Sequence, residues 1–474
     1  MELNTSQEYK RALLENSNLE SKYKEVLEVN HELDRKLVSF QGNKSEPIFR
    51  WFSYREGFSK ALVEYILDKV APKEGGVLLD PFAGTGAAPF VANKYKAMNG
   101  IAVELLPVGS FFIKCRNTFA TLSKSDLLYF AERTMASRQE WISIEPKWKF
   151  SHLRITEGAF DADSDRELDQ FRTWASQQDD EKFELFSTFV AFSILEKFSY
   201  TRKDGQYLRW DHRSPRFENK ARKTSFDKGR VYTFSEALFE KLSFISDDLQ
   251  QNSDLFGDYE EPTPDKVKVL TGSVLEHAGS IDENSIDYII TSPPYCNRYD
   301  YTRTYALELA YLGVDEDGIR TLRQELLTCT VENKPKSFDW IEDDVLDSAD
   351  KAFNDQEALQ ATLAFLEHEA AAGTLNNKGI KTMVRGYFYD LTVHLVQMSK
   401  LLKSGAKYVM VNDNVRYNGL EVPVDLILTD IATKVGFSCE RIWVLPKGKG
   451  NSSQQMKKHG RRELRKCVYV WTKN

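Results

Sequence analysis

A buried strand that runs into a glycine turn and then a helix is the feature that most restricts how this 474-residue chain can fold. The segment GVLLDPFAGTGAAPFVANKY (76–95) has this pattern, with an apolar run, the turn DPFAGTG and a helical stretch. NGIAVELLP (99–107) follows as a second strand, and it ends at Glu104. This order of elements predicts the opening of a doubly wound α/β sheet with mostly parallel strands.

The turn from Asp80 to Gly86 lies where sheets of this kind bind ligands. Gly84 and Gly86 allow close approach of the backbone and positive φ angles. Glu104 stands eighteen residues after Gly86, where an acidic side chain can accept hydrogen bonds from ribose hydroxyls. The turn lacks both GxGxxG and GK[ST], so neither a dinucleotide nor a nucleoside triphosphate is the predicted ligand. If the two glycines are considered alone, the alternative interpretation is a tight turn that binds no ligand.

A second apolar run, SIDYII (285–290), stops at TSPPYCNRYDYTRTY (291–305). Proline has no N–H, so Pro293 and Pro294 form a rigid ledge with carbonyl acceptors at the end of the strand. This ledge suits a planar ring with an exocyclic amino group: the Pro293 carbonyl and Ser292 oxygen accept its two N–H bonds, and Tyr295 stacks on the ring. Extracting such a base from a duplex costs a few kcal/mol, and stacking of about 1–3 kcal/mol offsets much of it. The alternative is a proline-stiffened loop with a buried tyrosine.

Further strand patterns complete the sheet. They lie at 266–274, 407–412, 437–445 and 467–472, and they bring the predicted total to about seven strands. Two long stretches interrupt the pattern, one from 111 to 265 and a helical one from 313 to 380. A helix is also predicted at 59–70, closed by Pro72 and two glycines.

The first forty residues predict a helix with an apolar seam at alternating steps of four and three. Such a seam is typical of a short coiled coil, in which a polar residue at a core position fixes the register. The helix would then form a homodimer, and the alternative is that it packs on its own domain. The seam positions are Leu19, Tyr23, Val26, Asn30, Leu33 and Leu37.

Positive charge is concentrated in two stretches of a chain whose net charge is −7. Residues 201–230 hold ten Lys or Arg against four Asp or Glu, interleaved with Tyr207, Trp210 and Phe217. Residues 446–466 hold eight basic residues and one acidic residue. Mobile cations bind phosphates and aromatic rings stack on unpaired bases, so these stretches favour a nucleic-acid partner, with a solvated surface loop as the alternative. The acidic helical segment 337–372 is expected to face away from that partner.

Five scattered cysteines, none in a CxxC pair, predict neither a disulfide framework nor a zinc site, and we expect no metal. No apolar run approaches the roughly 18 residues of a membrane span. The sequence therefore predicts a cytoplasmic protein in a reducing compartment.

DPFAGTG, Glu104 and TSPPY together resemble motifs I, II and IV of the amino-methylating DNA methyltransferases. FRWFSYREGFSKALVEYIL (49–67) is similar to the cofactor-side motif that often precedes motif I, and GSV (272–274) sits where motif III usually reads GDV. The resemblance implies a seven-stranded, Rossmann-like sheet and transfer of a methyl group from S-adenosylmethionine to the exocyclic amine of a flipped cytosine or adenine. It also implies double-stranded DNA as substrate, a nucleoid location and a cognate restriction endonuclease as partner.

Site residues are carried over from the same motifs. The resemblance implies that the cofactor is bound by Asp80, Pro81, Phe82, Gly84, Thr85, Gly86, Glu104 and Ser273, the last in place of an acid. The target base would be held by Ser292, Pro293, Pro294 and Tyr295. Cys296 suggests the cysteine nucleophile of cytosine-C5 methylation, but Tyr295 separates it from proline, which disfavours that chemistry. From the basic stretch we predict DNA contacts by Arg209, Arg213, Arg216, Lys220, Arg222 and Lys223.

Serine in SPPY favours cytosine-N4 over adenine-N6, because adenine enzymes more often have Asp or Asn there. An RNA guanine-N2 methyltransferase and an inactive nucleic-acid-binding subunit are the other hypotheses. We divide the chain into an N-terminal helix (1–44), a cofactor-binding part (45–110), an inserted target-recognition region (111–265), a catalytic part (266–312), a helical insert (313–380) and the end of the sheet (381–474).

Overall fold

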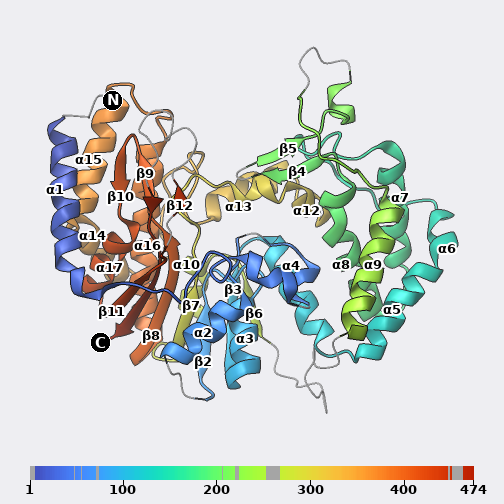
Figure 1. The fold of residues 1–474 in the computed structure, drawn as a ribbon, viewed down its shortest axis with the longest axis horizontal. Helices are drawn as coiled ribbons and strands as arrows, with labels where there is room; N and C mark the ends of the chain where they lie inside the picture. Colours follow the sequence, from blue (N-terminus) through green and yellow to red (C-terminus); the bar gives the residue numbers. More distant parts are fainter. Residues whose placement is uncertain are drawn as a thin grey trace.

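The computed structural model describes residues 6–46, 48–54, 56–70, 74–204, 207–218, 224–251, 267–446, 449–450 and 463–474. A central sheet has helices on both faces, and a separate group of helices lies beside one of its edges (Figure 1). The sheet is α/β and mostly parallel, as predicted. Among the described residues, none of the helices combines the length and apolar character that a bilayer span requires.

The central sheet has eight strands, in the order β1-β11-β14-β8-β7-β2-β3-β6. β14 is antiparallel to both of its neighbours, and the remaining neighbours pair in parallel. The strands are β1 (Leu27–Val29), β2 (Val77–Asp80), β3 (Asn99–Glu104), β6 (Lys268–Thr271), β7 (Ile286–Thr291), β8 (Leu402–Asp413), β11 (Phe437–Val444) and β14 (Lys466–Lys473).

The eighth strand and the course of the N-terminal helix differ from the prediction. Helix α1 (Gln7–Lys22) ends well before residue 44, and Leu27–Val29 pairs with β11 to become the edge strand β1. Seam residues pack within the chain itself. Leu19, on α1, is buried in the core on one face of the sheet, whereas Leu33 is buried in the core on the opposite face. One continuous coiled-coil stripe therefore does not form, because its residues serve two different cores.

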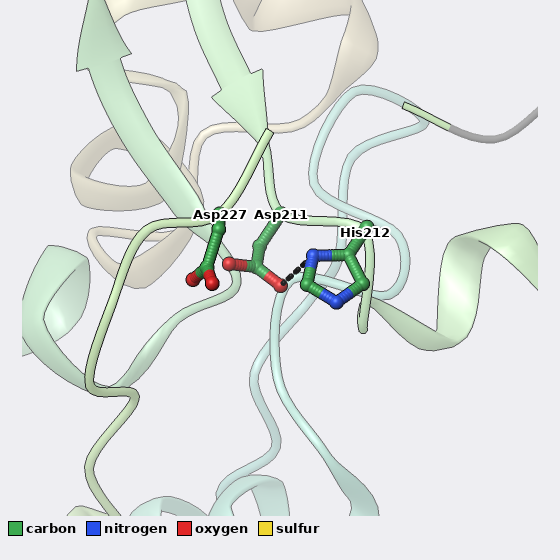
Figure 2. Close-up of side chains that lie close together, drawn as sticks. All are labelled: Asp211, His212 and Asp227. Atoms are coloured by element: carbon green, nitrogen blue, oxygen red, sulfur yellow. Dashed lines mark ion pairs between the residues drawn. The ribbon is translucent and has the colours of Figure 1, made fainter. Parts of the chain in front are cut away.

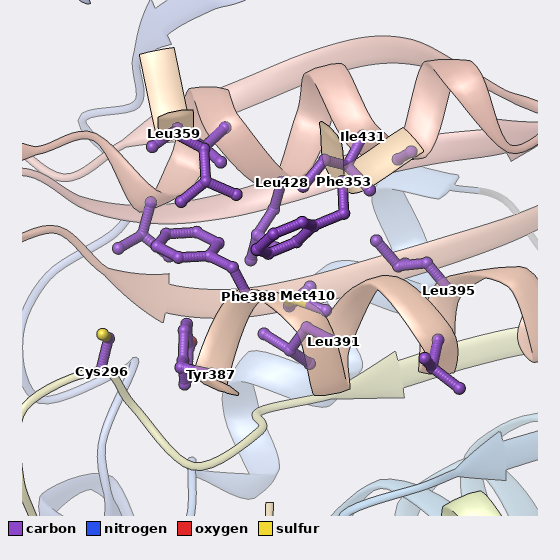
Figure 3. Packing of buried hydrophobic residues seen from close by; sticks show 14 of the residues in the cluster. Cys296, Phe353, Leu359, Tyr387, Phe388, Leu391, Leu395, Met410, Leu428 and Ile431 are labelled. Carbon is purple, nitrogen blue, oxygen red and sulfur yellow. The ribbon is translucent and has the colours of Figure 1, made fainter. Parts of the chain in front are cut away.

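Strand residues alternate between two cores, as the period of two demands. Leu79, Ile289 and Met410 face a core covered by α10 (Val274–His277), α16 (Ile380–Leu401) and α17 (Val424–Lys434), part of which is drawn in Figure 3. Their neighbours Leu78 and Ile290 face α2 (Lys60–Val70) and α3 (Ala87–Lys96) on the other side. This layering orients the carboxyl ends of β2, β3 and β7 toward one crevice.

A second group of helices has its own aromatic core. Phe183, Phe186, Phe189 and Phe192 of α8 are all buried there. The group comprises α4 (Pro107–Phe119), α5 (Lys124–Ala136), α6 (Arg138–Ile142), α7 (Ala162–Ala175), α8 (Glu181–Phe198) and α9 (Phe234–Gln251), with the hairpin β4 (Thr201–Asp204) and β5 (Tyr207–Trp210) at one end (Figure 1). Helix α4 starts at the sheet and carries the chain into this group.

The segment after TSPPY connects the sheet with these helices. It forms the short helices α11 (Tyr301–Thr304) and α12 (Ala306–Tyr311), then α13 (Glu316–Glu325). Helices α14 (Asp343–Asn354) and α15 (Glu357–Ala371) follow on the far side of the sheet, where α15 packs on α1 (Figure 1). The smaller hairpin β9 (Val415–Tyr417) and β10 (Leu420–Val422) follows β8.

Candidate functional site

The candidate site lies where the strand order reverses, between β2 and β7. From β2 the chain proceeds outward to β3, whereas from β7 it proceeds the other way to β8. In doubly wound sheets ligands bind at this switch point, outside the carboxyl ends of the strands. The last residues of the two strands are joined directly: the Thr291 hydroxyl donates a 2.6 Å hydrogen bond to Asp80. Burial raises the pKa of Asp80 to about 7, even though this bond and the Phe82 N–H lower it.

The DPFAGTG turn needs its glycines for space as well as for conformation. Gly84 has φ +55°, and a Cβ added to it would lie 2.9 Å from the Tyr54 ring. Gly86 has φ +75° and is the N-cap of α3. Backbone at Gly84 thus lies against an aromatic ring in a conformation that other residues rarely adopt.

Glu104, at the end of β3, ties the turn to the next helix. Its two carboxylate oxygens accept the backbone N–H groups of Gly84 (2.6 Å) and Leu106 (2.7 Å). Burial raises its pKa to about 8, and the two backbone donors offset part of that effect. A carboxyl group held in this way is fixed in orientation at the rim of the crevice.

These residues surround one cavity with about 840 Å³ of space, part of it open to solvent. Of the predicted cofactor residues, all except Gly86 line the cavity, and from the TSPPY motif Ser292 and Pro294 do so. The structure therefore brings two motifs more than 200 residues apart in sequence to one wall.

At the TSPPY ledge, the Ser292 hydroxyl lies 3.2 Å from the Val411 carbonyl oxygen and 3.1 Å from the Tyr295 hydroxyl. Pro293 is buried and Tyr295 is partly exposed. The Lys466 ammonium lies 5.4 Å from the Tyr295 ring centre and 3.3 Å from Asp413. Lys466 is the last residue of the basic stretch 446–466, but nothing in the sequence indicates that it pairs with Asp413 across neighbouring strands.

Other lining residues were missed or only partly anticipated. Tyr54 and Glu56 belong to the FSYREG segment, whose similarity to a cofactor-side motif was the available signal. Tyr301 and the stretch 325–327 also line the cavity, the latter from the end of α13. No local pattern marks Glu325, because it reaches the cavity only through the path of a long helical segment.

Cys296 is fully buried at the edge of the main core, near Tyr387 and Phe388 (Figure 3). Burial raises the pKa of its thiol, and its backbone carbonyl accepts a hydrogen bond from the Tyr417 hydroxyl. A nucleophilic cysteine must form a thiolate. The environment of Cys296 opposes that state, in agreement with our argument against cytosine-C5 chemistry.

The predicted DNA-contact arginines that the structure describes, Arg209, Arg213 and Arg216, are engaged within the protein. Arg209 pairs with Asp204 (3.1 Å) and lies over the Phe226 ring. Arg216 donates to the carbonyls of Arg154 and Ile155, so it ties the stretch to the helical group. Lys220, Arg222 and Lys223 lie outside the described residues, as does most of 446–466.

Asp211, His212 and Asp227 bring three potential metal ligands within 4.8 Å of one another (Figure 2). Arg213 already occupies this cluster: Nε and Nη2 each lie 2.8 Å from one oxygen of Asp211, and Nη2 lies 3.2 Å from Asp227. Arg213 also holds the pKa of Asp211 below its usual range. We therefore interpret the cluster as an ion-pair network that braces the basic stretch.

Comparison with known proteins identifies relatives that span nearly the whole chain. The chain is 42% identical to the type II methyltransferase M.AvaI of Nostoc sp. PCC 7120 over 464 residues, which cover 97% of this chain and 93% of that protein. It is 39% identical to the type II methyltransferase M.BsoBI of Geobacillus stearothermophilus, with 97% and 92% covered. No protein-family model and no solved structure matches it. With this identity over nearly the full length, the chain belongs to the type II methyltransferases, the site-specific, S-adenosylmethionine-dependent DNA methyltransferases of restriction-modification systems.

Proposed function

We propose that the chain methylates the exocyclic N4 of a cytosine that has been flipped out of double-stranded DNA. The observation that carries the proposal is Ser292: it directly follows strand β7 at the switch point, lines the cavity beside Pro294 and lies next to a partly exposed tyrosine. Serine at this place is the feature that separates cytosine-N4 from most adenine-N6 enzymes in the family that the motifs resemble. Adenine-N6 is the alternative target.

The lining of the cavity suits S-adenosylmethionine by its charge. Its described lining has the carboxyl groups of Glu56, Asp80, Glu104 and Glu325 and no lysine, arginine or histidine, which suits a ligand with cationic groups. We assign the methionine end to Asp80, Pro81, Phe82, Gly84, Thr85 and Gly86, the ribose to Glu104 and the adenine side to Ser273. The bound cofactor supplies an electrophilic methyl group on its sulfonium.

The chain's own task is to orient the amine. Donation of the single Ser292 hydrogen to the Val411 carbonyl, 3.2 Å away, leaves the Ser292 oxygen as an acceptor for one N–H of the base. The Pro293 carbonyl accepts the other N–H, and Tyr295 stacks on the ring. These contacts would favour a more tetrahedral amine nitrogen, so what the chain's own residues contribute to catalysis is largely the positioning of the amine. Because Cys296 is buried, no covalent enzyme intermediate enters this scheme.

We propose residues 111–265 as the target-recognition region. The β4–β5 hairpin presents Tyr207 at 54% exposure, with Arg209 and Arg213 on the same basic stretch. Neutralising Arg209, Arg213 and Arg216 together should weaken DNA binding and reduce its dependence on salt, since each lost phosphate contact removes roughly 0.9 from the slope. If DNA binding is unchanged in this variant, another surface contacts the DNA, and residues 446–466 are the next candidate.

The test of the reaction is base-resolved methylation sequencing of a plasmid carried in a methylation-free host. N4-methylcytosine at one recurring short sequence, absent with a Ser292→Ala, Tyr295→Ala variant, supports the proposal. N6-methyladenine at such a site would instead establish the alternative. An unmodified plasmid beside a soluble protein that binds S-adenosylmethionine would favour RNA or an inactive subunit. We also propose that the cognate partner is a restriction endonuclease that cleaves the same target sequence. Expression of that endonuclease alone in an unmodified host should be toxic, and co-expression of this chain should relieve the toxicity.

A further inference from the structure

The turn directly after TSPPY holds an arginine in a backbone conformation that arginine rarely adopts. Arg298 has φ +66°, and among the described non-glycine residues with positive φ it is the one with a charged side chain. Glycine and asparagine enter this left-handed region at a lower cost than a residue with a long side chain. Backbone strain of this kind is concentrated at sites of function, so the turn alone does not explain an arginine at this position.

Contacts on both sides of Arg298 hold the turn in place. Before it, the Cys296 carbonyl accepts a hydrogen bond from the Tyr417 hydroxyl. After it, the Tyr299 hydroxyl donates to Glu56. The chain is therefore fixed at two points close to Arg298, whereas the side chain of Arg298 is partly exposed.

The guanidinium of Arg298 forms no ion pair with any carboxylate that the structure describes. Arg303, five residues further on, is by contrast paired with Asp300 (3.2 Å) and Glu332 (2.7 Å). Arg298 is also not among the residues that line the cofactor cavity. Burial raises the pKa of Tyr417, and the nearby positive charge of Arg298 opposes this effect, so the guanidinium lies on the side of β9. An unpaired cation is thus held three residues after Tyr295 and outside the cofactor cavity.

We propose that Arg298 binds a phosphate of the DNA strand that carries the target base. Three residues separate Tyr295 from Arg298, so their Cα atoms lie at most about 11 Å apart. A base held against Tyr295 has its own sugar and phosphates beside it, within reach of a long side chain. A guanidinium suits a phosphate because it donates two parallel hydrogen bonds to it. The inference rests on the proposed role of the ledge, and it holds for cytosine and for adenine alike.

The test is a scan with neutral phosphates. Duplexes that contain the site found by methylation sequencing receive a methylphosphonate at one phosphate at a time, within about three nucleotides of the target base. At one position the wild-type protein should lose about tenfold in kcat/KM through a higher KM for DNA, because the contact binds ground state and transition state equally. Arg298→Asn should lose the same amount on unmodified DNA and nothing more at that position. The salt slope of its DNA binding should fall by roughly 0.9.

Control variants separate a phosphate contact from a structural role. Asparagine tolerates positive φ, so Arg298→Asn should melt at the wild-type temperature or above it. Lower stability with normal DNA kinetics would instead assign Arg298 to the fold and overturn the inference. Arg298→Lys keeps the charge and should recover most of the salt dependence. Arg11→Asn, which changes an exposed residue of α1, should behave like the wild type.

Equal kcat/KM and equal salt dependence in Arg298→Asn and the wild type overturn the inference. A scan in which every methylphosphonate affects both proteins alike does so as well. Failure of the proposed function gives a different result: the Ser292→Ala, Tyr295→Ala variant would then methylate the site normally, whatever the behaviour of Arg298→Asn.

Discussion

The buried ion pair between Lys203 and Glu308 gives the sharpest quantitative prediction. The ammonium lies 2.5 Å from the carboxylate, and the two side chains are only 3% and 2% exposed. Lys203 comes from β4 of the basic hairpin and Glu308 from α12, so the pair joins the region proposed to read DNA to the helix behind the TSPPY segment. Removing one partner of such a pair leaves an uncompensated buried charge, which costs about 3–5 kcal/mol.

Lys203→Met should therefore lower the apparent melting temperature of the protein strongly, whereas Lys203→Met with Glu308→Met should restore most of the loss, because a hydrophobic pair of similar volume can replace a buried ion pair. Arg320→Met is the matched control: it breaks an ion pair with Asp317 whose side chains are 64% and 82% exposed. That variant should melt like the wild type. All four proteins are compared at one heating rate by circular dichroism.

The loss should also depend on pH with a defined sign. Burial raises the pKa of Glu308 above its usual value, and Lys203 partly offsets this. Without Lys203 the folded protein holds the Glu308 proton still more tightly than the unfolded chain does, so its stability falls as pH rises above about 4.3. The deficit of Lys203→Met should thus be small near pH 4.5 and larger at pH 8. Two results would refute the reasoning: a deficit no greater than that of Arg320→Met, or a double variant as unstable as the single one.

The active-site region yields three further predictions. Gly84→Ala should lower the free energy of unfolding in urea by about 1–3 kcal/mol more than Gly75→Ala does. Both glycines have positive φ, but only a Cβ at Gly84 would contact a ring; equal losses would mean that the Tyr54 ring moves aside without cost. Tyr295→Ala should reduce methyl transfer while the Kd for S-adenosylmethionine stays within about twofold, since stacking of roughly 1–3 kcal/mol acts on the base; loss of both would contradict the stacking role. Cys296→Ala should retain transfer in a filter assay, and complete inactivity of the folded variant would reopen the cysteine chemistry.

Local patterns were sufficient for the central part of the sheet and for the parts of the cavity wall formed by DPFAGTG, Glu104 and TSPPY. An apolar run, a glycine turn and an acid at the end of the next strand are encoded within thirty residues, so Asp80, Gly84 and Glu104 could be placed before the structure was known. TSPPY is similarly compact. These features act through backbone conformation and hydrogen-bonding capacity, which the residue types themselves carry.

The parts that could not be predicted depend on distant partners. Leu27–Val29 becomes a strand only because the edge of β11 is available beside it, and nothing in three residues announces that. The apolar spacing from Leu19 to Leu33 imitates a heptad although its residues enter different cores. Glu325 and Lys466 reach the crevice through tertiary packing, and a single sequence does not record which segments will meet.

The tyrosine-rich segment after TSPPY connects the two binding functions that the motifs assign separately. Tyr295 is partly exposed at the proposed base-binding ledge, whereas the hydroxyls of Tyr299 and Tyr305 are held on Glu56 in the proposed cofactor cavity. Tyr305 is fully buried and a buried phenol needs a polar partner, so its hydroxyl cannot move away from Glu56 without cost. The proline ledge and the two tyrosines that hold Glu56 thus belong to one short stretch of chain, which explains why the sequence places several tyrosines directly after the two prolines.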